Sequence, residues 1–100
     1  MQVYSFYKFT KLDDLSKLRN NLYKCLDELN IKGTILISNE GINVNISQEN
    51  SLLDDALKRI NNFIDIKNIF INKGSSNGIA FEKLKVKIKD EIIKFNSPLY

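Results

Sequence analysis

The sequence predicts an α+β domain of the ferredoxin-like class, a βαββαβ sandwich in which two helices cover one face of an antiparallel sheet. Two apolar-alternating runs meet at residues 39–41 with almost no room for a loop, which indicates a β-hairpin. Two other segments repeat apolar residues at the spacing of an amphipathic helix. This order leaves the second face of the sheet to solvent or to a partner.

The expected strands begin with Val3 to Phe9, an aromatic-rich run that must send at least one or two rings to the uncovered face. The hairpin joins Thr34–Ser38 to Ile42–Ser47, and Gly41 supplies the positive φ that the turn needs. Glu40 in this turn is interpreted as a solvated carboxylate. By the usual topology of the motif, we expect the first and third strands to be central.

Two amphipathic helices are expected between these strands. The first follows a leucine stripe from Leu12 to Leu29, with Thr10 and Asp13 resembling a capping box at its start. The second begins near Ser51 and carries apolar positions from Leu53 to Ile64. Each helix therefore has one apolar face to bury against the sheet.

The remaining chain is expected to complete the sheet. Residues 66–71 are interpreted as a short extended segment, residues 73–78 as a loop, and residues 92–95 as a short last strand after the lysine-rich strand described below. We expect the domain to span residues 1–96, and residues 97–100 to begin a linker.

Composition excludes several classes of protein. A hydrophobic content of 43% excludes a disordered tail, and no apolar run approaches the ~20 residues that span a bilayer. Without a secretory signal pattern and with a single cysteine, the chain is expected to be cytoplasmic. Cys25 lies on or beside the apolar stripe of the first helix, so we interpret it as a packing residue. Because the chain has no histidine, we expect neither a Cys–His nucleophile, nor a metal site, nor a cofactor.

Positive charge is concentrated near the end of the chain. All of the net charge of +3 lies after residue 72, where six lysines are balanced by only three acidic residues. In the alternating run from residue 84 to residue 89, Lys85, Lys87 and Lys89 share one face of a strand, which makes them candidate phosphate contacts. Asn43 and Asn45 on the hairpin are weaker candidates for the same surface. The alternative is that the lysines are solvated, or protect a strand edge from pairing.

The uncovered sheet face is open to more than one interpretation. Its aromatic side chains would stack on the bases of single-stranded RNA, or pack under another domain or a second subunit of a homodimer. A small-molecule-binding module is a further alternative, since fold does not fix function. We do not expect acylphosphatase activity. The loop formed by residues 9–12 does not resemble the phosphate-binding loop of such enzymes, because it has neither the glycine nor the arginine of that loop.

Three segments in this order and separation carry a resemblance to a known family, namely residues 6–9 (FYKF), 37–43 (ISNEGIN) and 81–93 (FEKLKVKIKDEII). They are similar to the N-terminal, acylphosphatase-like domain of bacterial rhodanese-domain proteins of the tRNA uridine(34) hydroxylase family. The resemblance implies a role in oxygen-dependent hydroxylation of the wobble uridine of certain tRNAs, with tRNA as partner. The family's essential cysteine belongs to a rhodanese domain that is absent here, so Cys25 does not match it. We therefore expect the chain alone to support tRNA binding or domain docking rather than to catalyse.

Overall fold

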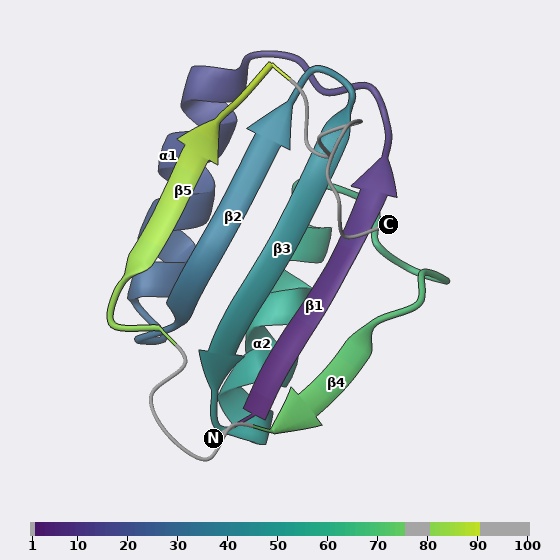
Figure 1. The fold of residues 1–100 in the computed structure, drawn as a ribbon. Helices are drawn as coiled ribbons and strands as arrows, with labels where there is room; N and C mark the ends of the chain where they lie inside the picture. Colours follow the sequence, from purple (N-terminus) through teal and green to yellow (C-terminus); the bar gives the residue numbers. More distant parts are fainter. Residues whose placement is uncertain (1, 76–80, 91–100) are drawn as a thin grey trace, which may run out of the picture.

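The computed structural model describes residues 2–75 and 81–90, and in it two helices lie against one face of a five-stranded sheet (Figure 1). This arrangement confirms the predicted ferredoxin-like class. The elements in chain order are β1 (Gln2–Phe9), α1 (Leu15–Asp27), β2 (Lys32–Ser38), β3 (Gly41–Gln48), α2 (Asn50–Asn61), β4 (Asn72–Ser75) and β5 (Leu84–Ile88).

The sheet has the strand order β4-β1-β3-β2-β5, so the first and third strands are neighbours at its centre, as predicted. Three of its four strand pairs are antiparallel, whereas β5 runs parallel to β2. The sheet is therefore mixed rather than wholly antiparallel. The lysine-rich strand is the fifth strand in chain order and lies at one edge of the sheet. The fourth strand, β4, lies at the opposite edge.

That fourth strand corrects the prediction for residues 66–75, and residues 76–78 of the expected loop lie outside the described residues. The apolar residues 66–71 do not form a strand, and β4 instead lies in the first part of the expected loop, where Asn72 to Ser75 pair with Ser5 to Gln2. The apolar residues of this segment suggested a strand, but Ile66 is buried in the core while the segment itself is irregular. Strand formation at the polar residues of β4 depends on pairing with β1 rather than on intrinsic propensity.

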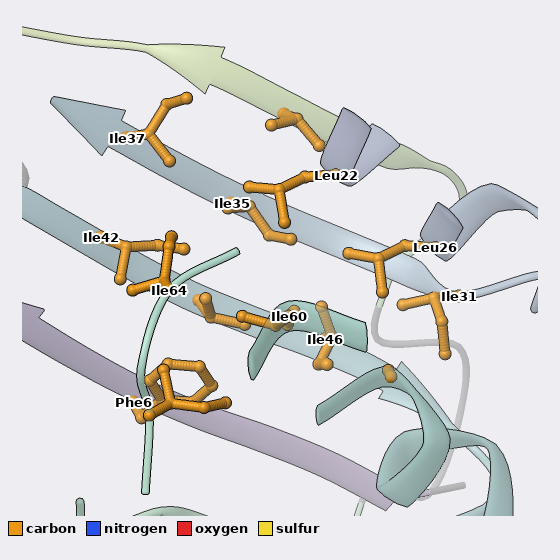
Figure 2. Close-up of a cluster of buried hydrophobic side chains, with 14 of the residues drawn as sticks. Phe6, Leu22, Leu26, Ile31, Ile35, Ile37, Ile42, Ile46, Ile60 and Ile64 are labelled. Atoms are coloured by element: carbon orange, nitrogen blue, oxygen red, sulfur yellow. The ribbon is translucent and has the colours of Figure 1, made fainter. Parts of the chain in front are cut away.

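The hydrophobic core lies between the sheet and the two helices (Figure 2). Alternate residues of the strands point into it, and the helices contribute one stripe each, which follows from the two periodicities in the sequence. Figure 2 shows Ile35 of β2 beside Leu22 of α1, and Ile46 of β3 beside Ile60 of α2. The fully buried large apolar side chains are Leu22, Leu26, Ile31, Ile35, Ile37, Ile42, Val44, Ile46, Leu53 and Ile60.

Both helices begin without the side-chain caps that the sequence suggested. The cap of α1 is Asp14 in the left-handed region, at φ 50°, and no side-chain hydrogen bond caps it, so the expected capping box of Thr10 and Asp13 is wrong. The amide of Thr10 instead donates to the carbonyl of Glu40 at 3.0 Å, which binds this loop to the hairpin turn. α2 is preceded by Glu49, also without a side-chain cap.

Two glycines set the geometry of the hairpin strands. Gly41 has φ 153°, which confirms its predicted place in the turn between β2 and β3. Gly33 in β2 has φ 140°, and a Cβ added there would lie 2.1 Å from the backbone oxygen of Asn45. A side chain at position 33 would therefore force β2 away from β3.

Some expectations lie outside the described residues, namely the short strand at residues 92–95, the exit at residues 97–98 and the domain boundary after residue 96. In the described part of the chain, neither helix has the length and apolar character needed to cross a membrane.

Candidate functional site

The strand register brings all the predicted site residues to the sheet face that the helices leave uncovered. On this face, residues of β1, β3, β2 and β5 stand side by side in rows, and neighbouring strands lie about 4.8 Å apart. One row contains Ser5, Asn45, Thr34 and Lys85, and the next contains Tyr7, Asn43, Leu36 and Lys87.

The lysines of β5 have the predicted orientation. Lys85 and Lys87 are exposed, whereas Leu84 and Val86, which alternate with them, are buried against the helices. Lys89 follows the strand, is also exposed, and its amide donates to the carbonyl of Ile37 at 2.8 Å. Alternate positions of a strand are about 6.7 Å apart, so these three lysines follow one another at even intervals along the backbone. We refer to Lys85, Lys87 and Lys89 as the lysine edge.

The outer side of β5 is closed to further strands by a helix side chain. Bonding alternates along a strand, and Lys89 bonds to β2, so the carbonyl of Val86 faces outward. The guanidinium of Arg19 in α1 donates to this carbonyl at 2.9 Å and also lies 5.3 Å from the ring centre of Tyr23. The lysine edge is therefore fixed to the helix layer while its ammonium groups stay exposed.

Asn43 and Asn45 lie at the centre of the same face. Both are half-buried, and the side-chain amide of Asn45 donates to the side-chain oxygen of Asn43 at 3.1 Å. The strand β2 separates them from β5, so they stand about 10 Å from the lysine edge. The structure thus brings the five predicted residues onto one surface but not into one cluster.

A hollow beside the lysine edge was not predicted. It has a volume of about 270 Å³ and lies where β5 begins next to β2. Thr34 of β2 lines this hollow only because β2 and β5 pair in parallel, and a local sequence pattern does not predict that pairing. Its lining residues are Thr34, Phe81, Glu82, Lys83 and Lys85.

Two aromatic side chains project from β1 on the uncovered face, as predicted. Tyr7 is 57% exposed and Phe9 is 59% exposed. Their rings lie 5.7 Å apart in an edge-to-face arrangement with an interplanar angle of 75°. Exposed rings of this kind suit either a base or an apolar partner side chain.

The loop after β1 does not have the geometry of a phosphate cradle. Its amides at Thr10 and Leu12 donate to carbonyls of the hairpin turn, and the side chain of Asn39 donates back to the carbonyl of Leu12 at 3.0 Å. Neither arginine lies in this loop, since Arg19 bonds to β5 and Arg59 donates to the carbonyl of Cys25 and pairs with Glu28 at 2.8 Å. The expected lack of acylphosphatase activity stays a prediction.

Cys25 is placed as a packing residue. It is half-buried, and its thiol contacts the carbonyl of Leu22 at 3.5 Å. Burial is the main cause that raises its pKa, and the Glu28 carboxylate raises it further, against the opposing effect of Arg59. The thiol is therefore a poorer nucleophile than an ordinary cysteine. Among the described residues, no group of three or more His, Cys, Asp or Glu could hold a metal ion.

Comparison with known proteins places this geometry in context. The profile of a family described as the UPF0176 acylphosphatase-like domain matches residues 1–92. A Synechocystis protein named tRNA uridine(34) hydroxylase is 32% identical over 97 residues, which cover 97% of this chain and 35% of the relative. A Pelagibacter ubique protein of the same name is 39% identical over 92 residues, which cover 91% of this chain and 31% of the relative. The chain therefore spans about a third of the length of these curated relatives.

Solved structures agree on the fold. An acylphosphatase from Bacillus subtilis superposes with a TM-score of 0.69 at 10% sequence identity, covering 86% of this chain and 98% of that one. Full-length HypF matches with a TM-score of 0.60 at 12% identity, over 92% of this chain and 13% of that one. At such identities the likeness establishes the acylphosphatase-like arrangement alone.

Proposed function

Because the chain belongs to the UPF0176 acylphosphatase-like domain family, we propose that it is the accessory domain of a cytoplasmic tRNA-modifying protein and contributes to the binding of tRNA. The observation that supports this proposal is the lysine edge, a row of exposed lysines at even intervals along the backbone, on a face that no helix covers. Phosphate contacts by lysine give affinity without reading sequence, which suits an accessory surface. Asn43 and Asn45 would contact the RNA more weakly beside this row.

The chemistry would reside elsewhere in a longer protein. The curated relatives that carry the name tRNA uridine(34) hydroxylase are about three times as long as this chain. We propose that oxygen-dependent hydroxylation of the wobble uridine takes place on a rhodanese domain in cis, which this domain assists. The bonded loop after β1 and the protonated, half-buried Cys25 support an accessory rather than a catalytic role for the 100 residues themselves.

Reversal of the lysine edge tests this proposal. The triple variant Lys85→Glu, Lys87→Glu and Lys89→Glu is expected to weaken binding of unmodified tRNA about tenfold or more at low salt. The slope of log affinity against log salt should fall in magnitude by about 2 to 3, because three phosphate contacts are lost. Binding would be measured by fluorescence anisotropy over a series of salt concentrations.

A matched control separates local contacts from net charge. Lys17, Lys24 and Lys58 are exposed on the helices, and their triple reversal to glutamate changes net charge by the same amount. The control variant is expected to keep most of the affinity and the full salt slope. Equal losses in both variants, or unchanged binding in the first, would overturn the RNA role of this edge.

A second candidate function is a protein-interaction module without an RNA role. The observation that favours it is the pair of exposed rings of Tyr7 and Phe9, since exposed apolar patches mark partner surfaces. Unchanged tRNA binding on reversal of the lysine edge would favour this alternative.

A further inference from the structure

The outer edge of β1 is paired along only half of its length. β4 lies beside Gln2 to Ser5, and Asn72 opposite Ser5 is the last pair. Beyond that pair, no described residue forms a strand next to Phe6–Phe9 on this side, and the chain that leads into β4 runs outward (Figure 1). Among the described residues, the place of the next strand beside the second half of β1 is therefore empty, and we refer to it as the gap. We refer to residues Phe6–Phe9 as the aromatic edge.

The backbone groups of Tyr7 and Phe9 point into this gap. The amide of Thr10 donates to the carbonyl of Glu40 across the β1–β3 pair. Because bonding direction alternates along a strand, the even-numbered residues of β1 bond to β3 and the odd-numbered residues face the other way. In the first half of β1 those outward groups meet β4, whereas in the second half no strand among the described residues pairs with them.

An uncharged hollow lies beside the aromatic edge. It has a volume of about 340 Å³ and sits between β1 and the segment that leads into β4. Its rim includes Phe70, which is 80% exposed, and Tyr7. No charged side chain of the described residues lines it, so it suits an apolar side chain rather than a phosphate. The lining residues are Phe6, Tyr7, Ile69, Phe70 and Asn72.

We propose that the aromatic edge binds a short extended segment of a second protein, added as an antiparallel strand beside β1 and in line with β4. The main-chain groups of Tyr7 and Phe9 would bind the backbone of this segment, and its side chains would alternate between the two faces. The partner residue opposite Lys8 shares the helix side with that ammonium group. The group donates to the backbone carbonyl of Asp65 and has two further N–H groups, so an acidic residue fits there. The partner residue opposite Phe6 lies over the hollow, so an apolar residue fits there.

A second copy of this chain fits the same edge poorly. The antiparallel register that pairs Tyr7 of one copy with Phe9 of the other uses all the outward groups of the edge. It also places the two Lys8 residues directly opposite each other, and like charges in that position destabilise a strand pair. A register moved toward the start of β1 would need Ser5, which already pairs with β4. The edge therefore selects a foreign segment with an apolar–acidic–apolar pattern.

Two synthetic peptides test this proposal with the chain itself. The first is acetyl-Thr-Val-Glu-Val-Leu-amide, in which glutamate stands opposite Lys8, leucine stands over the hollow opposite Phe6, and the peptide ends before Ser5, which pairs with β4. The second differs only by lysine in place of glutamate. In an NMR titration, the first peptide is expected to shift the amide signals of Phe6 to Phe9 and of Phe70, and to bind at least about threefold more tightly than the second. No shift at these positions, or equal affinity of the two peptides, would overturn the proposal.

Amide hydrogen exchange and one backbone variant sharpen the test. In the free chain, the amides of Tyr7 and Phe9 should exchange much faster than those of Phe6 and Lys8, and the first peptide should slow them. Slow exchange at Tyr7 and Phe9 without peptide would contradict an open edge. Tyr7→Pro removes an outward N–H without removing a bond to β3, so it should abolish peptide binding, whereas Tyr7→Thr should retain it. The comparison of the two peptides remains decisive even where the proline variant does not fold.

Sedimentation equilibrium distinguishes a foreign strand from a second copy. The chain is expected to be monomeric, because Lys8 would oppose itself in a symmetric pair. A dimer that Tyr7→Thr retains and the uncharged variant Lys8→Gln strengthens would show that the edge is filled by another copy, and the proposal of a foreign segment would then fail. Neither result depends on tRNA, so this inference and the RNA role fail separately.

Discussion

The two sides of this sheet, at β5 and at the second half of β1, differ in how their outward backbone groups are covered. On the β5 side, exposed lysines stand on one face, and Arg19 occupies the outward carbonyl of Val86 at 2.9 Å. On the β1 side, β4 stops at Asn72 and leaves the aromatic edge without a strand partner among the described residues. Charge and a covering side chain are two ways in which proteins prevent strand addition. One edge is therefore protected against further strands, whereas the other is not.

This difference separates two kinds of binding within a small domain. The lysine edge offers charge, and Arg19 occupies the outward carbonyl of Val86, which suits a polyanion such as RNA better than an added strand. The aromatic edge offers backbone groups and apolar area with little charge, which suits a polypeptide strand. Because several strands lie between the two edges, both sites could be occupied together.

The largest expected effect is on the free energy of unfolding, and it compares the packing of β2, next to the lysine edge, with the packing of β4, next to β1. Gly33→Ala places a Cβ 2.1 Å from the Asn45 backbone oxygen at φ 140°, so β2 and the attached β5 must move away from β3. We expect a loss of about 2–4 kcal/mol in the free energy of unfolding, measured by urea denaturation. Gly74→Ala in β4 is the matched variant, because a Cβ there meets nothing within 4 Å.

The Gly74→Ala variant is expected to change stability by less than about 0.5 kcal/mol. Similar losses at positions 33 and 74 would show that β4 packs as tightly as β2. The contrast between a fixed lysine edge and a loosely covered β1 side would then be wrong.

An intermediate effect is expected where β1 meets α2. The Tyr4 hydroxyl donates to the Asp54 carboxylate at 3.1 Å, and the Lys73 ammonium group lies 5.0 Å from the Tyr4 ring centre. Tyr4→Phe keeps the ring and removes the hydrogen bond, so a loss of about 1 kcal/mol in the free energy of unfolding is expected at pH 7. Chemical denaturation with the wild type as reference would measure it.

The same variant carries a pH signature. Burial is the main cause that raises the pKa of Tyr4 above its ordinary value, and the hydrogen bond and the charge of Asp54 raise it further. The neutral phenol is thus favoured in the folded state, so its contribution to stability is complete below about pH 10 and declines as the pH rises through the folded-state pKa. Tyr4→Phe should remove this alkaline component. An identical alkaline decline in both proteins would contradict the assignment to Tyr4.

Local patterns in the sequence predicted much of this comparison. The hairpin, the two helices and the outward direction of the lysines depend on residue periodicity, and the structure agrees with each of them. The position of β4 could not be predicted, because Asn72 to Ser75 are polar and form a strand through pairing with β1. The parallel addition of β5 to β2 is likewise a long-range pairing.

The candidate sites were predicted to different degrees for the same reason. The face of the lysine edge follows from alternation within one strand, although its RNA role stays a prediction. Exposed rings on β1 were also expected from alternation, and Tyr7 and Phe9 confirm them. The gap beside the aromatic edge was not predicted. It exists because β4 pairs with only the first half of β1, which the sequence does not indicate.

The smallest expected effect concerns the centre of the face, between the two edges. Asn45 is half-buried and one of its two amide hydrogens already bonds to Asn43 at 3.1 Å, so its access to a ligand is reduced. Asn45→Thr is therefore expected to weaken tRNA binding only about two- to threefold, the equivalent of about 0.5 kcal/mol. The salt slope should stay unchanged, because an amide neutralises no phosphate. A loss in affinity as large as that of the lysine reversal would move the main RNA contact from the lysine edge to the centre of the sheet.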